Sequence, residues 1–162
     1  MHVRPAELSD AEAIAAIYNA EVLGSTATFD LVPRSFVEQR DWLLERSGAH
    51  AVLVAETADG EIAGYASLSK FRDRPAYSTT VETSVYVHEH HRRQGIARVL
   101  MLELVETAKS HGFHALIARI ADSQDASLKL HEQLGFSLVG VEREVGRKFG
   151  RWLDVSVMQV VL

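Results

Sequence analysis

The sequence predicts an α/β fold in which a mixed, mostly antiparallel β-sheet is flanked by helices. From residue 81 to residue 141, apolar β-branched runs alternate with helical patterns, which favours parallel pairing in the centre of the sheet. The apolar runs 51–56 and 62–69 are separated by turn residues 58–60, which predicts an antiparallel hairpin. With 162 residues, of which 47% are hydrophobic, the chain is long enough for one compact core and short for two. We therefore expect a single domain over residues 1–162.

Two helices are expected in the first third of the chain, after a short strand at residues 2–5. Both begin with the spacing of a capping box, and the paired residues are Ser9 with Glu12 and Ser35 with Glu38. The helices run from about residue 10 to 20 and from 35 to about 46. Between them, the β-branched threonines of residues 24–30 oppose a helix and leave Phe29 on a loop. There Phe29 either lines a pocket or fixes the loop to the core.

In the second half of the chain, strands and helices alternate, and glycines stop the helices. The expected strands are residues 81–87, 115–120, 136–141 and 152–161, and the expected helices are residues 95–110 and 127–134. Gly112 and Gly135 stand where glycine commonly ends a helix. Before these elements, the segment 70–77 contains three cations and a proline, which indicates a positively charged loop.

The junction between the strand at 81–87 and the following helix predicts an anion site. A helix N-terminus leaves four main-chain N–H groups without partners inside the helix, and the helix dipole adds a partial positive charge there. The loop consists of Arg92, Arg93, Gln94, Gly95, Ile96 and Ala97. Gly95 has no Cβ, so a phosphate can approach the main chain, and Ala97 keeps the first turn narrow. The alternative is an ordinary turn with solvated arginines.

Composition and charge exclude several classes of protein. The net charge of −5 argues against a nucleic-acid surface, which needs clustered basic residues. The chain has no Cys, which excludes disulfides, thiolate metal sites and a cysteine nucleophile and fits a reducing compartment. The N-terminus shows no apolar signal core, and no stretch approaches about 18 unbroken apolar residues. We therefore expect no membrane span, no secretion and a cytoplasmic location.

A metal hydrolase built on His88, His90 and His91 is a competing interpretation. These histidines do not have the spacing of a helical His-x-x-x-His pair, and no Cys is present to complete a site. We therefore expect no metal.

Several motifs resemble the GNAT acetyltransferase superfamily. The stretch VYVHEHHRRQGIA resembles its acetyl-coenzyme A signature, and Arg92, Gly95 and Ala97 match the pattern Arg/Gln-x-x-Gly-x-Gly/Ala. The stretch SLKLHEQLGF, which begins at Ser127, is similar to the last cofactor helix of the superfamily. The blocks TATFD, FRDRPAY, VETSVYV, LHEQLGF and GRKFGRW resemble the phosphinothricin acetyltransferase branch, which also acts on methionine sulfoximine and sulfone. Together these blocks extend over residues 26–152.

This resemblance implies a V-splayed GNAT sheet that binds acetyl-coenzyme A as cosubstrate. Val85, Tyr86 and Val87 would offer main-chain groups to the pantetheine arm, while the amine enters from the opposite side. Two residues differ from the wider superfamily pattern. Gln124 stands where an Asn often contacts the cofactor, and His131 stands where a Tyr often protonates the leaving thiolate. The related branch also leads us to expect a homodimer whose site lies close to the interface.

Acetyl transfer to an amine needs a base, donors for the oxyanion and a proton for the leaving sulfur. The resemblance implies Glu82 as the base, acting directly or through water, with a main-chain N–H near Val85 as oxyanion donor. Partial burial on its strand would raise the pKa of Glu82. His131 is either the leaving-group acid or a helix-capping or core histidine.

The expected acceptor is a small amino-acid analogue of the phosphinothricin, methionine sulfoximine or methionine sulfone type. Arg72 and Arg74, with Tyr77 nearby, suit bidentate binding of its carboxylate, and the equivalent loop of the related branch holds the substrate. Solvated loop arginines are the alternative. Two other functions stay open: acetylation of another small amine, and a noncatalytic acyl-coenzyme A sensor. A sensor would keep Gly95 and have no need of Glu82.

Overall fold

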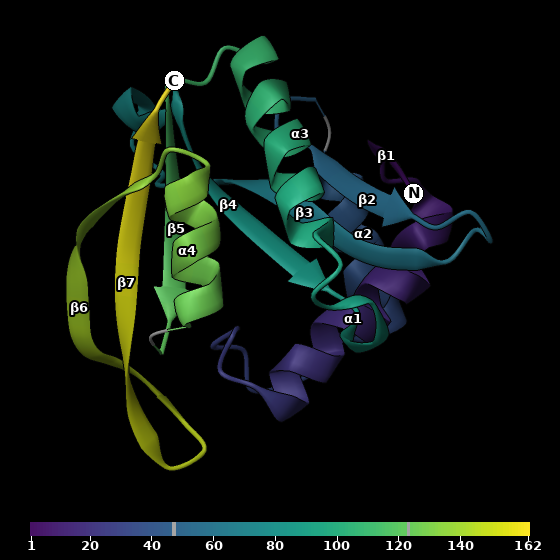
Figure 1. The fold of residues 1–162 in the computed structure, drawn as a ribbon, viewed down its shortest axis with the longest axis horizontal. Helices are drawn as coiled ribbons and strands as arrows, with labels where there is room; N and C mark the ends of the chain where they lie inside the picture. The colour runs from purple at the N-terminus through teal and green to yellow at the C-terminus, as the bar shows by residue number, and fades with distance from the viewer. Residues whose placement is uncertain (47, 123) are drawn as a thin grey trace.

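A computed structural model describes residues 1–46, 48–122 and 124–162. In these residues, seven strands form one sheet in the order β1-β2-β3-β4-β5-β7-β6, with α1 and α2 on one face and α3 and α4 on the other (Figure 1). The strands are β1 His2–Pro5, β2 Val52–Glu56, β3 Ile62–Lys70, β4 Thr80–Val87, β5 Ala115–Ala121, β6 Ser137–Lys148 and β7 Arg151–Val161. The helices are α1 Ala11–Gly24, α2 Phe36–Glu45, α3 Ile96–Ser110 and α4 Asp125–Gln133.

Strands β4 and β5 form the parallel pair that the sequence predicts, and they separate after four residue pairs. Their register runs from Thr80 opposite Ala115 to Thr83 opposite Ala118. Beyond this point β4 continues beside β3, and β5 continues beside β7, both in antiparallel pairing. Figure 1 shows the two strands diverging from one end of the sheet. The sheet therefore consists of two antiparallel halves joined at the start of β4 and β5, as the V-splayed fold requires.

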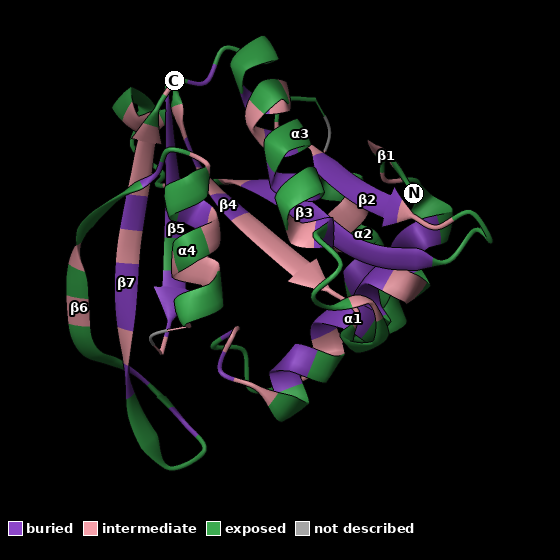
Figure 2. Ribbon diagram, in the orientation of Figure 1, coloured by how far each residue is buried: buried purple, intermediate pink, exposed green. Residues whose placement is uncertain are grey.

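Each face of the sheet has its own hydrophobic core (Figure 2). On one face, α3 buries Leu100, Met101 and Leu104 completely against the strands. On the other face, α1 buries Ile14 against Tyr65 of β3. Complete burial of an apolar side chain of this size contributes about 1.5–3 kcal/mol. The helices are thus fixed on the sheet by packing, which holds their ends in defined positions beside the splay.

The structure corrects the predicted cap of the first helix. Ser9 and Glu12 do not form the predicted capping box, because residues 8–10 form a short 3-10 turn before α1 begins. The capping pair is Glu7 with Asp10, and the main-chain N–H of Glu7 donates to Asp10 Oδ2 at 2.7 Å. Asp10 also accepts two hydrogen bonds from Arg4 of β1. The acidic side chain competes better than Ser9 for this position because it binds a cation as well as the main chain.

The second capping box is confirmed, since the Ser35 N–H donates to Glu38 at 2.7 Å and the Glu38 N–H donates to the Ser35 hydroxyl at 3.1 Å.

The last two strands are longer than predicted and form one hairpin, β6–β7. Its two-residue turn consists of Phe149 and Gly150, with φ angles of 52° and 72°. Positive φ at both turn positions is the geometry that joins twisted antiparallel strands most directly. The charged residues in 142–148 had hidden the second half of β6 from the sequence prediction.

Gly64 allows β3 to lie close to β4 and α3. A Cβ at this position would lie 2.8 Å from the main-chain oxygen of Tyr86 and 3.3 Å from the side chain of Leu100. We predict that Gly64→Ala lowers the free energy of unfolding by about 1–3 kcal/mol, the usual cost of overpacking. Gly140→Ala in β6 is the matched control, because a Cβ there meets no atom within 4 Å. Urea denaturation of both variants measures the difference, and equal stabilities would contradict the close packing at Gly64.

Candidate active site

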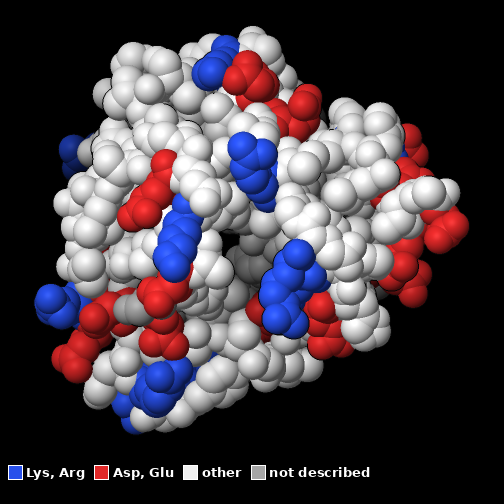
Figure 3. Space-filling model, in the orientation of Figure 1, with Lys and Arg blue, Asp and Glu red and all other residues white. Residues whose placement is uncertain are grey.

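The divergence of β4 and β5 opens a small pocket of about 70 Å³ that α4 closes on one side. Its wall includes five residues predicted as cofactor or catalytic residues: Val85, Tyr86, Gln124, Ser127 and His131. Val87 lies further along β4, beside β3. In Figure 3, which has the orientation of Figure 1, this face is hollowed between α4 and β4, and basic side chains lie on the rim. The structure thus brings together residues that lie about 45 positions apart in the sequence.

The loop before α3 follows the C-terminal end of β4 (Figure 1). Arg93 and Gly95 have φ angles of 60° and 78°, and the helix begins at Ile96, whose side chain is buried in the core. Residues 92–95 are exposed, and a Cβ on Gly95 would meet no atom within 4 Å. Gly95 therefore suits this position because its main chain has a left-handed conformation that other residues rarely adopt, and the space beside it is open to a ligand.

Arg92 differs from the solvated arginine that the sequence allowed. Its Nη2 forms an ion pair with Glu21 at the end of α1, and Glu21 also accepts a hydrogen bond from the Ser25 hydroxyl. The predicted cofactor loop is therefore bound to α1 through a buried carboxylate. Gln94 donates to the main-chain oxygen of His90 at 3.4 Å. Main-chain N–H groups, rather than the Arg92 guanidinium, are the free donors at this helix start.

Glu82 lies on the face of the sheet opposite α3. Its neighbours Val81 and Thr83 are buried on the α3 side, and side chains alternate along a strand. The register partner of Glu82 on β5 is Ile117, and Arg119 follows two residues later on the same face. Burial raises the pKa of the Glu82 carboxyl group, and the charge of Arg119 opposes this rise. The result is a half-buried carboxylate beside the splay with an increased affinity for a proton.

His131 is held in one orientation on α4. Its Nδ1 is 2.7 Å from the main-chain oxygen of Ser127, and the ring packs edge-on against Phe136. Because a carbonyl oxygen accepts hydrogen bonds, this contact assigns the proton of the neutral ring to Nδ1 and leaves a lone pair on Nε2. Burial lowers the pKa of His131. The ring is therefore uncharged at neutral pH, and any proton that Nε2 receives is readily given up.

The predicted substrate loop lies beside a second cavity of about 370 Å³. Arg72 donates to the Tyr77 hydroxyl at 3.3 Å and stacks over Phe71, and all three residues line this cavity. Arg74 lines a neighbouring open depression together with Arg72 and Tyr77, and it is not among the residues that line this cavity. Arg72 is thus better placed than Arg74 to contact a small molecule in the cavity.

The same cavity contains Arg119 and Glu142, which the sequence analysis missed. Their side chains form an ion pair with 2.5 Å between Nη2 and Oε1. One signal was present in the sequence, since Arg119 is the single charged residue in the apolar strand ALIARIA. A charge in such a strand is unfavourable unless it has a partner or a function.

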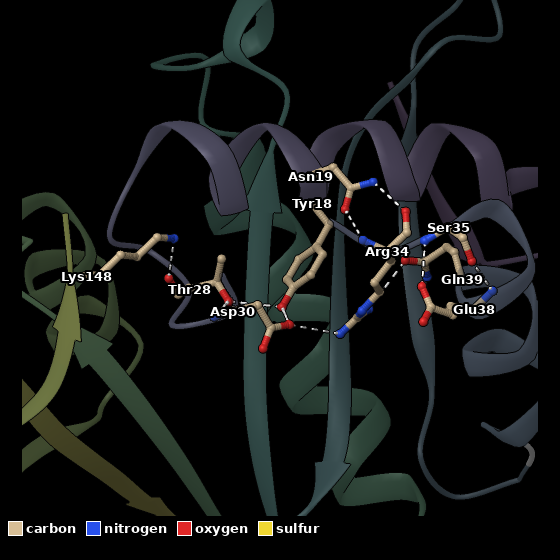
Figure 4. A network of polar contacts seen from close by, with 9 residues as sticks. All are labelled: Tyr18, Asn19, Thr28, Asp30, Arg34, Ser35, Glu38, Gln39 and Lys148. Atoms are coloured by element: carbon tan, nitrogen blue, oxygen red, sulfur yellow. Dashed lines mark hydrogen bonds and ion pairs between the residues drawn. The ribbon is translucent and has the colours of Figure 1, made fainter. Parts of the chain in front are cut away.

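Phe29 packs against the chain instead of lining either cavity. Its ring lies over Gly146 of β6, where an added Cβ would be 2.3 Å from the ring. The loop that carries it is fixed by polar contacts (Figure 4). The Lys148 ammonium group donates to the main-chain oxygen of Thr28 at 2.9 Å. The Tyr18 hydroxyl group forms hydrogen bonds with the Thr28 hydroxyl group and the Asp30 carboxylate. The sequence left this choice open, and the structure favours Phe29 as an anchor of the loop.

His88, His90 and His91 pack against one another, with ring centroids 5.0 Å and 5.8 Å apart. The Nδ1 of His88 accepts from the His90 N–H and caps the short turn before α3. In the part of the chain that the structure describes, no three His, Cys, Asp or Glu side chains are arranged to hold a metal ion. Over the same residues, no helix is both long and apolar enough to cross a membrane.

Comparison with known proteins identifies the family. Residues 3–157 match the family described as "Acetyltransferase (GNAT) domain". The L-methionine sulfoximine/L-methionine sulfone acetyltransferase of Pseudomonas aeruginosa is 38% identical and aligns with 99% of this chain and 94% of its own. The phosphinothricin N-acetyltransferase of Streptomyces coelicolor is 40% identical, with 96% and 93% covered. The solved phosphinothricin acetyltransferase of Sinorhizobium meliloti, in complex with AcCoA, superimposes with a TM-score of 0.96 at 37% identity, covering 99% of this chain and 88% of that one. The chain therefore belongs to the GNAT acetyltransferase family.

Proposed function

We propose that residues 1–162 form one N-acetyltransferase domain that transfers the acetyl group of acetyl-coenzyme A to the amino group of a small amino-acid analogue. The phosphinothricin, methionine sulfoximine and methionine sulfone type of acceptor fits the names of the relatives. One observation carries the proposal. The splay of β4 and β5 opens beside the free amides of the α3 start, while Glu82 lies on the opposite face of the same strand. A thioester and an amine can therefore approach one strand from two sides.

The residues around the splay fit acetyl-coenzyme A. Strand β4 continues past its last pair with β5, so its edge is open to a ligand that hydrogen-bonds like a strand. The exposed residues 93–95 and the helix start that follows them offer main-chain N–H groups that suit a pyrophosphate. Gln124 and Ser127 at the start of α4 face the same pocket. When bound, acetyl-coenzyme A supplies the acetyl thioester, and the chain supplies binding and proton transfer.

We assign proton removal from the acceptor to Glu82. An ammonium group cannot attack a thioester, so a base must first take a proton from the nitrogen. The raised pKa of Glu82 improves its ability to accept that proton, directly or through one water. The main-chain N–H of Val85, in the pocket wall, is the proposed donor to the oxygen that gains negative charge.

We propose His131 as the acid that protonates the leaving sulfur. Its Nδ1–H is bound to Ser127, so Nε2 must first take up a proton from solvent, which it then gives to the sulfur as the C–S bond breaks. The lowered pKa makes the protonated ring a strong donor, although it holds the proton only briefly at neutral pH.

Arg72 is the proposed partner of the acceptor carboxylate, with Tyr77 orienting the guanidinium and Arg74 at the entrance. A cytoplasmic location and a homodimer stay predictions. The hairpin β6–β7 supports a dimer, because it exposes more than half the surface of five large apolar side chains: Leu138, Val139, Val145, Phe149 and Trp152.

The first functional prediction concerns the α3 start. We expect Gly95→Ala to weaken acetyl-coenzyme A binding at least tenfold, the equivalent of about 1.4 kcal/mol, because its methyl group occupies the space that a phosphate needs. Gly112→Ala is the control, since Gly112 also has a positive φ and open surroundings but lies at the other end of α3. Both variants should lose similar stability, so calorimetric titration separates binding from folding. Equal affinity in the two variants would contradict the pyrophosphate assignment.

The second prediction concerns the base. We expect Glu82→Gln to bind acetyl-coenzyme A normally and to lose about 10²–10⁴-fold in kcat near pH 7. In wild type, protonation of Glu82 should reduce the rate as the pH falls through its raised pKa, and this acid limb should disappear in the variant. Thiol release measured across the pH range tests both points, with the exposed Glu12→Gln of α1 as control. A fully active Glu82→Gln enzyme would eliminate the assignment, and binding without turnover in wild type would indicate a sensor.

The third prediction concerns the acceptor carboxylate. We expect Arg72→Ala to raise the KM for an α-amino acid acceptor about 10–100-fold, which corresponds to the loss of a charge-assisted hydrogen bond of roughly 1.5–3 kcal/mol. Arg74→Ala should have a smaller effect, because Arg74 does not line the cavity. The decarboxylated amine should be a poor substrate for wild type and should lose nothing further in Arg72→Ala. An unchanged preference for the carboxylate in that variant would show that another group binds it.

A further inference from the structure

Arg119 is a charged residue in β5 that the proposed reaction does not yet use. The register pairs Ile117 with Glu82, and Arg119 follows on the same face of the sheet. Ala118 and Leu116 point to the opposite face and are buried in the α3 core. The Arg119 side chain therefore leaves β5 on the same face of the sheet as Glu82. About a third of the Arg119 side chain, 37%, is exposed.

Glu142 holds the Arg119 side chain across the intervening strand β7. Arg119 pairs in register with Val157 of β7, and Glu142 lies on β6 beyond it. The 2.5 Å ion pair between the two side chains restricts the guanidinium to the wall of the larger cavity. Arg119 thus has one fixed carboxylate partner on β6, and Glu82 lies on β4, on the other side of β5 in the sheet.

Few other charges face Glu82. The opposite residue on β3 is Ser69, which carries no charge, and α1 contributes the neutral Tyr18 through its contact with Tyr86. The segment 71–77 contributes Arg72 and Tyr77, which line the same cavity as Arg119. From β5 and β6 the charged groups are Arg119 and Glu142. Arg119 is the cation that acts on the ionisation of Glu82, since its charge opposes the rise in pKa that burial causes.

We propose that Arg119 is a positioning residue for the general base: its charge favours the ionised form of Glu82, and Glu142 moderates that charge by binding the guanidinium. This inference rests on the proposed role of Glu82. A buried base must hold a proton tightly enough to remove it from an ammonium group and must also be unprotonated when the acceptor arrives. Burial provides the first property, and a nearby cation provides the second.

The test compares Arg119→Met, Arg119→Lys and Glu142→Gln with wild type across the pH range. The informative quantity is kcat/KM of each variant divided by that of wild type, because ionisation of the acceptor cancels in this ratio. For Arg119→Met we expect this ratio to be about three- to tenfold lower on the acid limb, where Glu82 takes up its proton, than at about pH 9. This is about the effect of one neighbouring charge. Arg119→Lys should restore most of the wild-type profile. Glu142→Gln should move the acid limb to lower pH, in the opposite direction.

A titration of the Glu82 carboxyl carbon by NMR gives a readout that does not require catalysis. The pKa of Glu82 should rise in Arg119→Met and fall in Glu142→Gln. An unchanged Glu82 titration in both variants would overturn the inference even if Glu82→Gln proved the base assignment. Conversely, a fully active Glu82→Gln enzyme would refute the assignment of Glu82 as the base. The NMR titration would still show whether the charge of Arg119 affects the ionisation of Glu82.

Two further outcomes are decisive. If Arg119→Met lowers kcat/KM equally at every pH and raises only the acceptor KM, Arg119 binds substrate and the inference is wrong. If Arg119→Met does not fold, the opposite displacement of the acid limb in Glu142→Gln decides the question, since that variant keeps the guanidinium.

Discussion

The separation of β4 from β5 after four residue pairs is the constraint on which the rest of the structure depends. Each strand stays paired on its outer side, β4 with β3 and β5 with β7, so neither half of the sheet unravels where the two diverge. Helices α3 and α4 pack on the same face of the sheet, and the N-terminal end of α4 lines the opening. A main-chain group left without a partner in a buried setting costs about 1–3 kcal/mol. A ligand that completes the hydrogen bonds of β4 therefore binds where the sheet itself is incomplete.

The two sides of β4 have different electrostatic characters, which suits a reaction between a phosphorylated cosubstrate and an amine. On the α3 side, exposed amides follow Gly95, and Arg92 is bound to Glu21. On the other side, carboxylates and guanidinium groups are paired or partly buried. Lys148 and Tyr18 fix the loop after α1 by hydrogen bonds to Thr28, and Tyr18 also binds Asp30 of this loop (Figure 4). Burial lowers the pKa of the Lys148 ammonium group, so its protonation favours the unfolded chain and the folded state gains stability as the pH rises through the lowered value.

Local patterns in the sequence predicted most elements of the fold, because strand alternation, helix periodicity and glycine stops are short-range signals. The parallel pair in the centre, the second capping box and the helix start at Gly95 all follow from such signals. The structure places Val85, Gln124, Ser127 and His131 in one pocket, which only motif resemblance had connected. The partner of Arg119 was not predictable, because Glu142 lies on a strand that β7 separates from β5, and the charges of residues 142–148 obscured the length of β6. The cap at Glu7 was missed because its acidic partner Asp10 is stabilised by Arg4 of β1, a side-chain contact that the capping-box spacing does not include.

The central claim is that this fold transfers acetyl groups to the amine of a small α-amino acid analogue. The most direct measurement is thiol release from acetyl-coenzyme A with a panel of primary amines, with the acetylated product identified by mass spectrometry. The panel should include phosphinothricin, methionine sulfoximine, methionine sulfone, ordinary amino acids and amines without a carboxylate. We predict stoichiometric N-acetylation of the analogues and poor turnover of the amines without a carboxylate. Tight binding of acetyl-coenzyme A with no turnover of any amine, or a preference for amines without a carboxylate, would contradict this account.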